Sequence, residues 1–203
     1  RLNKLLDPAT NDGLPGFLIV NEDATESGFM IVQYTAAAIV NDLASRAHPA
    51  SVYSIPTSAN AEDHVSVGAN EARHVLAMAD DLGKVLGLEL YTAAQALDLR
   101  LDMINAARAL AAHGDAQALA AKVHGWPLPG SGEHDGFLAE IEGLRVELAA
   151  AAEFRPGRAV AAAHAAIRNR ISFLPRDRAL DGDVAAAVGM VDDGSVLAAS
   201  RAG

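Results

Sequence analysis

Cysteine is absent from the 203 residues, and aromatic side chains make up only 4% of them. Without cysteine there can be no disulfide, thiolate zinc site, iron–sulfur cluster or cysteine nucleophile, and a reducing compartment, by default the cytoplasm, is the expected location. No apolar run approaches the roughly 18 residues of a membrane span, and no basic N-terminal stretch leads into a signal-like segment. We therefore expect a soluble protein without a membrane partner.

Basic residues are also few, with 16 Lys and Arg against 26 Asp and Glu and a formal net charge of -10. This balance opposes binding to nucleic-acid phosphates or anionic lipid, so we expect no nucleic-acid partner. Alanine is abundant instead, at 44 residues. Small side chains with few aromatics favour closely packed helices, and the composition predicts an all-α fold.

Hydrophobic periodicity places the main helices. A first helix is expected from Gly28 to Ala47, with Thr25 or Ser27 available as its N-cap. A long central helix is expected from about Glu62 to Met103, about 60 Å in length. Its apolar stripe comprises Ala72, Val75, Leu76, Ala79, Leu82, Leu86, Leu90, Ala93 and Leu97. A helix of this length needs a multi-helix bundle to cover it, so we expect oligomerisation.

The C-terminal part reads as shorter helices. An Ala-rich helix continues to about residue 123, and the Gly/Pro-rich stretch 125–136 is the clearest loop. Three amphipathic helices are then expected, with apolar positions at 137–148, 160–171 and 184–191, the last stopped by Gly194. The sequence thus divides into a helical core (1–124), a loop (125–136) and a C-terminal helical region (137–203).

Most chemistry-bearing patterns have ordinary interpretations. Glu71-x-x-His74 is half of a di-iron carboxylate motif, but its partners are missing, so we expect a solvated helix pair and no metal. Gly130-x-Gly132 lacks the spacing and the preceding strand of a dinucleotide loop. A basic cluster at a helix end is expected to be a solvated cap of the helix dipole: Arg168, Arg170, Arg176 and Arg178.

The segment Glu62-Asp63-His64 stands apart, because three titratable groups follow a Ser/Thr-rich turn at the expected start of the long helix. There a carboxylate can transfer a proton or hold a cationic group, favoured by the helix N-terminus. The alternative is structural, with Asn60 or Asp63 capping the helix and Glu62 a first-turn acid. Spacing alone leaves both interpretations open.

Ordered motifs extend over the first hundred residues. They are Gly13-Leu14-Pro15, Ser27-Gly28-Phe29-Met30-Ile31, His48-Pro49-Ala50-Ser51-Val52, Ser54-Ile55-Pro56-Thr57-Ser58-Ala59-Asn60, Glu62-Asp63-His64-Val65-Ser66, Ala93-Ala94-Gln95 and Leu97-Asp98-Leu99-Arg100. These stretches resemble the aromatic amino acid ammonia-lyases, and among these the histidine ammonia-lyases. The resemblance weakens from about Asp102 to Gly157 and resumes near an Arg-Asp-Arg segment at 176–178.

The resemblance implies elimination of ammonia from an aromatic amino acid in a homotetramer. The cofactor would be an electrophilic methylidene-imidazolone, formed from an internal Ala-Ser-Gly tripeptide that lies upstream of the matching part. These 203 residues contain no Ala-Ser-Gly. The resemblance therefore implies the C-terminal part of such an enzyme, dependent on the upstream part and catalytically incomplete by itself.

Glu62 matches the active-site glutamate that histidine ammonia-lyases place against the substrate, where the phenylalanine and tyrosine enzymes carry glutamine. A carboxylate can stabilise a cationic imidazole and a carboxamide cannot, so Glu62 favours conversion of L-histidine to trans-urocanate. Ala61 and Tyr53 depart from the usual Gln and Asp. The rival hypotheses are a lyase or 2,3-aminomutase acting on tyrosine or phenylalanine, and a non-catalytic helical oligomerisation module.

Overall fold

A computed structural model describes residues 1–20, 25–112, 150 and 152–203. All regular elements in these ranges are helical, which confirms the all-α prediction. Within them, no helix combines the length and apolar character needed to cross a membrane. The elements are α1 (Leu2–Leu6), the 3₁₀ turn η1 (Gly16–Leu18), α2 (Met30–Arg46), the 3₁₀ turns η2 (Ala50–Val52) and η3 (Ser58–Asn60), α3 (Gly68–Ala112), α6 (Arg158–Arg168), α7 (Asp181–Asp192) and α8 (Ser195–Ala202).

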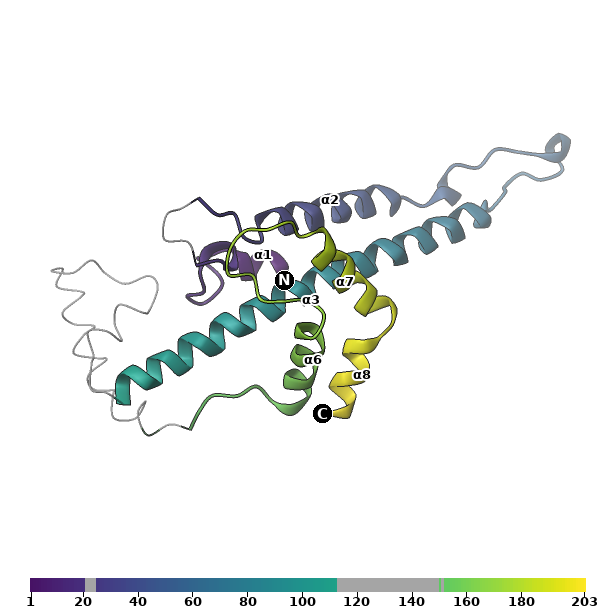
Figure 1. Cartoon of the computed structure of the whole chain (residues 1–203). Coiled ribbons are helices and arrows are strands. Elements are labelled where there is room, and N and C mark those ends of the chain that lie inside the picture. The colour runs from purple at the N-terminus through teal and green to yellow at the C-terminus, as the bar shows by residue number, and fades with distance from the viewer. Residues whose placement is uncertain (21–24, 113–149, 151) are drawn as a thin grey trace.

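Helix α3 is the axis of the fold (Figure 1). Its 45 residues correspond to a rod of about 67 Å. Helix α2 lies antiparallel along one part of it, α7 crosses it, and α6 and α8 pack as a pair beside it. The N-terminal and C-terminal parts of the chain therefore meet on the same long helix.

The core forms around the middle of α3. Leu88, Tyr91 and Leu99 are buried there, and the Tyr91 ring lies 4.7 Å from that of Phe29 between centroids. Other large core side chains come from α1, the η1 region, α6, α7 and the segment between α6 and α7: Leu2, Leu6, Leu14, Leu18, Ile167, Ile171, Leu174 and Met190. One hydrophobic cluster thus joins the two ends of the chain.

A buried glutamine binds two distant loops to α3. The Gln95 amide donates to the carbonyls of Leu18 (3.2 Å) and Leu174 (2.9 Å), and its oxygen accepts from the Leu174 N–H (3.1 Å). Buried backbone groups in loops need such partners, because water cannot reach them. Gln95, part of a motif in the sequence, therefore has a structural role.

Helix α7 crosses α3 at a glycine. A β-carbon placed on Gly87 would lie 2.8 Å from the backbone nitrogen of Val188 and 2.9 Å from its Cα. Contacts this short do not occur between real side chains and a backbone, so only glycine permits this crossing distance.

Ion pairs on the surface of the fold connect α3 to α2 and α6. Asp81 on α3 binds Arg46 at the end of α2 (2.8 Å) and Lys84 (2.7 Å). The hydrogen bond from Lys84 lowers the pKa of the Asp81 carboxyl. Asp98 similarly binds His164 (2.7 Å) and Arg168 (2.6 Å) on α6. These pairs tie α2 and α6 to the long helix.

The structure corrects several expectations. Helix α3 begins at Gly68 and not near Glu62, because Val67 is left-handed (φ 49°) and the preceding residues are bonded elsewhere. The predicted apolar stripe is not the face buried in this chain: Val75 and Leu76 are 63% and 74% exposed. The N-cap of α2 is Phe29, without a side-chain cap.

The structure confirms some of the elements predicted for the C-terminal part and does not describe others. The helix stopped by Gly194, whose φ is +66°, is confirmed as α7, and α8 beyond it was not predicted. The expected loop 125–136 and the expected helix at 137–148 lie outside the described residues. The division into 1–124, 125–136 and 137–203 remains a prediction.

Three of the four arginines in the expected cluster are not solvated caps, whereas Arg176 is exposed and has no partner among the described residues. Arg168 lies partly buried against Asp98, and Arg170 binds Asp193 at 2.7 Å. Arg178 binds Asp183 and donates to the carbonyls of Ser172 and Phe173. Sequence proximity to a helix end suggested a dipole effect, but the carboxylates that bind these arginines come from separate elements.

Candidate active site

The candidate residue Glu62 lies in the tip loop, the segment from Ala47 to Val67 that connects α2 to α3. The tip loop extends beyond the helical body at the end of the α2–α3 hairpin (Figure 1). Its position at the end of two long helices places it where, among the described residues, it can reach another surface.

The backbone around Glu62 is closed on itself. Thr57 and Glu62 form an antiparallel bridge, with N–H to carbonyl distances of 2.8 and 3.2 Å. The turn between them contains three consecutive left-handed residues, Ser58, Ala59 and Asn60, with φ of 52°, 54° and 69°. For residues other than glycine this conformation costs about 1–2 kcal/mol each. Such strain persists where the surroundings fix it and is common at functional sites.

The Glu62 side chain is exposed, and no described residue donates a hydrogen bond to its carboxylate. The interpretation of Glu62 as a first-turn acid of the long helix is wrong, because α3 starts six residues later. Because Glu62 is not in the first turn of α3, the N-terminus of that helix does not act on its carboxylate as predicted. What remains is a solvent-facing carboxylate on a backbone fixed by the Thr57 bridge.

Two more bonds anchor the arms of the tip loop. The Glu71 carboxylate accepts the N–H of Ser51 (3.1 Å), and the Ser54 hydroxyl accepts the N–H of Val65 (2.7 Å). The expected solvated pair of Glu71 with His74 is not formed among the described contacts, and Glu71 instead orders the loop. Among the residues that the structure describes, no cluster of three potential metal ligands occurs.

The two departures noted in the sequence lie in this loop. Ala61 is exposed directly before Glu62. The Tyr53 hydroxyl lies 3.1 Å from Nε2 of His48, with the rings edge-on at 5.4 Å. This pair joins two residues on either side of η2, and no sequence pattern indicated that they would meet.

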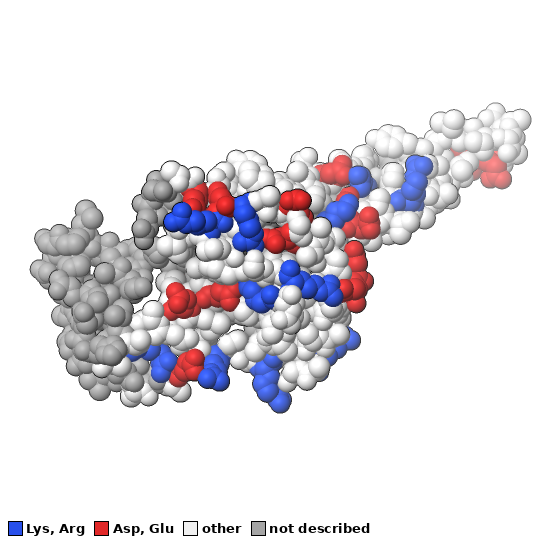
Figure 2. All heavy atoms as spheres, viewed as in Figure 1, with Lys and Arg blue, Asp and Glu red and all other residues white. Residues whose placement is uncertain are grey.

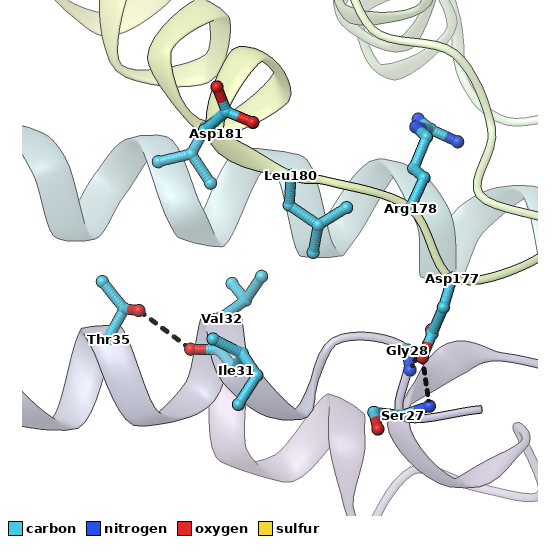
Figure 3. A pocket seen from close by; sticks show the side chains of 10 residues that line it. Ser27, Gly28, Ile31, Val32, Thr35, Asp177, Arg178, Leu180 and Asp181 are labelled. Atoms are coloured by element: carbon cyan, nitrogen blue, oxygen red, sulfur yellow. Dashed lines mark hydrogen bonds between the residues drawn. The ribbon is translucent and has the colours of Figure 1, made fainter. Parts of the chain in front are cut away.

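A separate groove of about 450 Å³ lies between α2 and the segment leading into α7 (Figure 3). Its walls include Ile31, Val32 and Leu180, and Asp177 lies at one end. Both oxygens of Asp177 are engaged, one with the Ser27 N–H (2.6 Å) and one with the Gly28 N–H (2.8 Å). The carboxylate thus closes the start of α2 and is not available as a base.

Two apolar grooves, of about 390 and 490 Å³, flank α3 beside α6 and α8. Both are lined by Leu90, Ala93 and Ala163, so the second half of the predicted stripe faces open grooves. Figure 2 shows basic and acidic side chains interleaved over the helical body on the face in view. Over the described residues, that face has no continuous basic surface of the kind that binds nucleic acid.

A partly buried cluster of titratable groups, Tyr91, Asp183 and Arg178, has a structural role. Burial and a 2.8 Å hydrogen bond to Asp183 raise the pKa of the Tyr91 hydroxyl, which therefore stays protonated. Arg178 binds the same carboxylate at 2.7 Å. This cluster, missed at the sequence level, fixes the loop before α7.

Comparisons with known proteins agree with the tip-loop motifs. The model of the family described as "Aromatic amino acid lyase" matches residues 1–121. The chain is 53% identical over 100 residues to histidine ammonia-lyase 1 of Fusobacterium nucleatum and 54% identical over 100 residues to histidine ammonia-lyase of Natranaerobius thermophilus. Each match covers 49% of this chain but only 19% and 20% of those proteins.

Solved structures share the fold over almost the whole chain. Histidine ammonia-lyase from Trypanosoma cruzi superposes with a TM-score of 0.67 at 24% identity, covering 98% of this chain and 29% of that one. Tyrosine aminomutase from Streptomyces globisporus gives 0.66 at 24% identity, covering 98% and 28%. At these identities the likeness concerns the fold alone, and this chain spans less than a third of either protein.

Proposed function

Because this chain belongs to the aromatic amino acid lyase family, we propose that it is the Glu62-bearing, C-terminal part of an enzyme that eliminates ammonia from L-histidine to give trans-urocanate. The observation that carries the proposal is an exposed carboxylate on a rigid turn inside the part of the chain that matches the family. Identity above 50% to histidine ammonia-lyases over 100 residues supports the choice of substrate.

Glu62 would act on the substrate ring or on its β-proton. A carboxylate can accept a hydrogen bond from an imidazole N–H and stabilise the cationic ring, or it can receive a proton. The Thr57 bridge fixes the backbone of Glu62, and the side chain has no competing partner among the described residues. Both features suit a group that must meet a substrate supplied from outside this chain.

The proposed reaction would need a methylidene-imidazolone, which would supply the electrophile that activates the substrate for loss of ammonia. No Ala-Ser-Gly occurs in these 203 residues, so the upstream part of the protein would have to supply it. The exposed tip loop fits this arrangement, since Glu62 faces solvent at the end of the α2–α3 hairpin, where another part of the enzyme can meet it. The chain alone would then be inactive.

The uncovered apolar surface supports an assembly. Exposed Val75, Leu76 and Leu82 lie on the half of α3 nearest the tip loop, and apolar grooves flank its other half. We expect the upstream part of the protein and further copies, in a homotetramer, to cover these surfaces. The cytoplasm remains the expected compartment.

A lyase or 2,3-aminomutase of the same cofactor type acting on tyrosine or phenylalanine is the second candidate. Ala61 favours it, because alanine in place of the usual glutamine removes an amide directly beside Glu62. Product analysis separates the candidates, since elimination yields an arylacrylate and ammonia whereas an aminomutase yields a β-amino acid. A non-catalytic helical module would release no ammonia from any of these substrates in the intact protein.

The test is Glu62→Gln in the full-length protein, with L-histidine as substrate and urocanate absorbance as the readout. We expect kcat to fall by about 10²- to 10⁴-fold, the range for a lost acid–base group. Glu153→Gln is the matched control, because Glu153 is exposed and pairs with Arg155 far along the chain. Turnover within a few-fold of the unmodified enzyme would contradict the role assigned to Glu62.

A further inference from the structure

Tyr53 is an exposed aromatic side chain of the tip loop. It is 73% exposed, and its hydroxyl lies 3.1 Å from Nε2 of His48. The two rings meet edge-on at 5.4 Å between centroids, across the single turn η2. An aromatic pair in solvent contributes little to folding, so stability alone does not explain this geometry.

The backbone on both sides of Tyr53 is fixed. Ser51 is bonded to Glu71, and Ser54 is bonded to Val65. The Tyr53 N–H itself donates to the Ala50 carbonyl (3.2 Å). The ring therefore projects from a rigid base, and the bond to His48 restricts its remaining side-chain freedom.

The same bonds relate Tyr53 to Glu62. The Ser54 hydroxyl accepts the Val65 N–H, and the Thr57–Glu62 backbone bridge follows three residues later, so these two contacts hold the arms of the tip loop together. Tyr53 lies directly before the first of these pairs. At about 3.4 Å per extended residue, it is at most about 14 Å along the arm from the Thr57–Glu62 pair. An amino acid held between two long side chains can fill such a span.

The Tyr53 hydroxyl keeps hydrogen-bonding capacity. A phenol can donate one bond and accept two, and His48 uses one of these three. If the imidazole accepts the phenol proton, both lone pairs of the oxygen remain. If the imidazole donates, the phenol proton remains. In either case a polar group on a substrate ring can be bound, whereas a benzene ring offers none.

We propose that Tyr53, positioned by His48, is a specificity-determining residue that contacts the ring of the aromatic amino acid acted on by Glu62, and that it favours a ring bearing N–H or N over an unsubstituted phenyl ring. The inference rests on the proposed function. It assigns His48 a positioning role and Tyr53 a direct contact.

The experiment uses the full-length enzyme and three substrates, L-histidine, L-phenylalanine and L-tyrosine, with kcat and KM measured separately. For Tyr53→Phe we expect KM for L-histidine to rise about 3- to 10-fold with kcat changed less than about 2-fold, the size of one lost hydrogen bond. KM for L-phenylalanine should not rise, so the preference for histidine over phenylalanine should fall by a similar factor. His48→Ala should shift the preference in the same direction, and His48→Gln, which keeps a polar side chain, should restore part of it.

Tyr34→Phe is the matched control, because Tyr34 is 68% exposed on α2 and lies outside the tip loop. It should leave every constant unchanged. An unchanged preference in Tyr53→Phe would overturn the inference, as would equal losses for all substrates accompanied by a lower thermal midpoint. If the unmodified enzyme turns over none of the three substrates, the proposed function itself fails, and this inference fails with it.

Discussion

Two glycines four residues apart on α3 should respond in opposite ways to the same substitution. A β-carbon on Gly87 would meet backbone atoms of α7, the Val188 nitrogen at 2.8 Å and the Ala187 carbonyl carbon at 3.0 Å. A β-carbon on Gly83 would have only the Asp192 carboxylate oxygen nearby, at 3.8 Å. Gly83→Ala is therefore the matched control for Gly87→Ala.

The magnitudes follow from these contacts. Replacing glycine by alanine inside a helix contributes about 0.8–1.0 kcal/mol at either position. At Gly87 this gain is opposed by overpacking, which costs about 1–3 kcal/mol and more where backbone must move. We expect Gly83→Ala to stabilise the chain by up to about 1 kcal/mol and Gly87→Ala to destabilise it by about 2 kcal/mol. For a chain of about 200 residues, a difference of about 3 kcal/mol corresponds to roughly 6–12 °C between the two thermal midpoints.

Thermal unfolding followed by far-ultraviolet circular dichroism measures both variants on the same scale. Hydrogen exchange adds a local readout, since Gly87→Ala should lower protection in α7 more than in α2. If Gly87→Ala raised the midpoint as Gly83→Ala does, α7 would not cross α3 at Gly87, and the close approach of these two helices would be refuted.

Two further predictions concern polar contacts between elements of the fold. Gln95→Leu leaves the Leu18 and Leu174 carbonyls and the Leu174 N–H without their partner. At about 1–3 kcal/mol for each buried group, we expect the free energy of unfolding in urea to fall by at least about 3 kcal/mol, against under about 1 kcal/mol for the control Gln33→Leu. Equal losses in the two variants would contradict the role of Gln95 in holding the two loops. The Ser195 side chain, the Arg170 guanidinium and the Ser195 N–H lower the pKa of Asp193 to about 2 from 3.8. Its ionised form therefore stabilises the fold above about pH 4, and this contribution is lost as the pH falls through about 2. Asp193→Asn should lower the thermal midpoint at about pH 6 but not at about pH 2, and a difference independent of pH would refute the assignment.

Much of the helical content could be predicted from local pattern. The first helix, the long central helix and the helix ending at Gly194 follow from apolar spacing and turn residues. Apolar spacing does not predict the ends of these helices, because a helix ends where its backbone finds other partners. Helix α3 starts at Gly68 and not near Glu62, because Glu62 and Val65 are bonded to Thr57 and Ser54, which periodicity cannot show.

The sequence predicted the identity of the candidate site residue but not its surroundings. Glu62 was identified from its motif, and its role remains a prediction, but its surroundings came from the structure. Helical spacing suggested a first-turn acid, whereas the left-handed turn at Ser58–Asn60 places Glu62 on an exposed bridge. The Tyr53–His48 bond depends on the fold of a single turn, and no pattern in the sequence indicated it.

Composition, periodicity and ordered motifs are local properties, and they were enough to predict the helical class, the order of the main helices and the family. They do not show which face of α3 is buried, because that depends on segments distant in the chain. Leu88, Tyr91 and Gln95 turn toward Phe29, Leu18 and Leu174, while the more regular stripe through Leu76 and Leu86 stays uncovered. Both faces of that helix are apolar, and the choice between them depends on contacts with segments as far as 92 positions away.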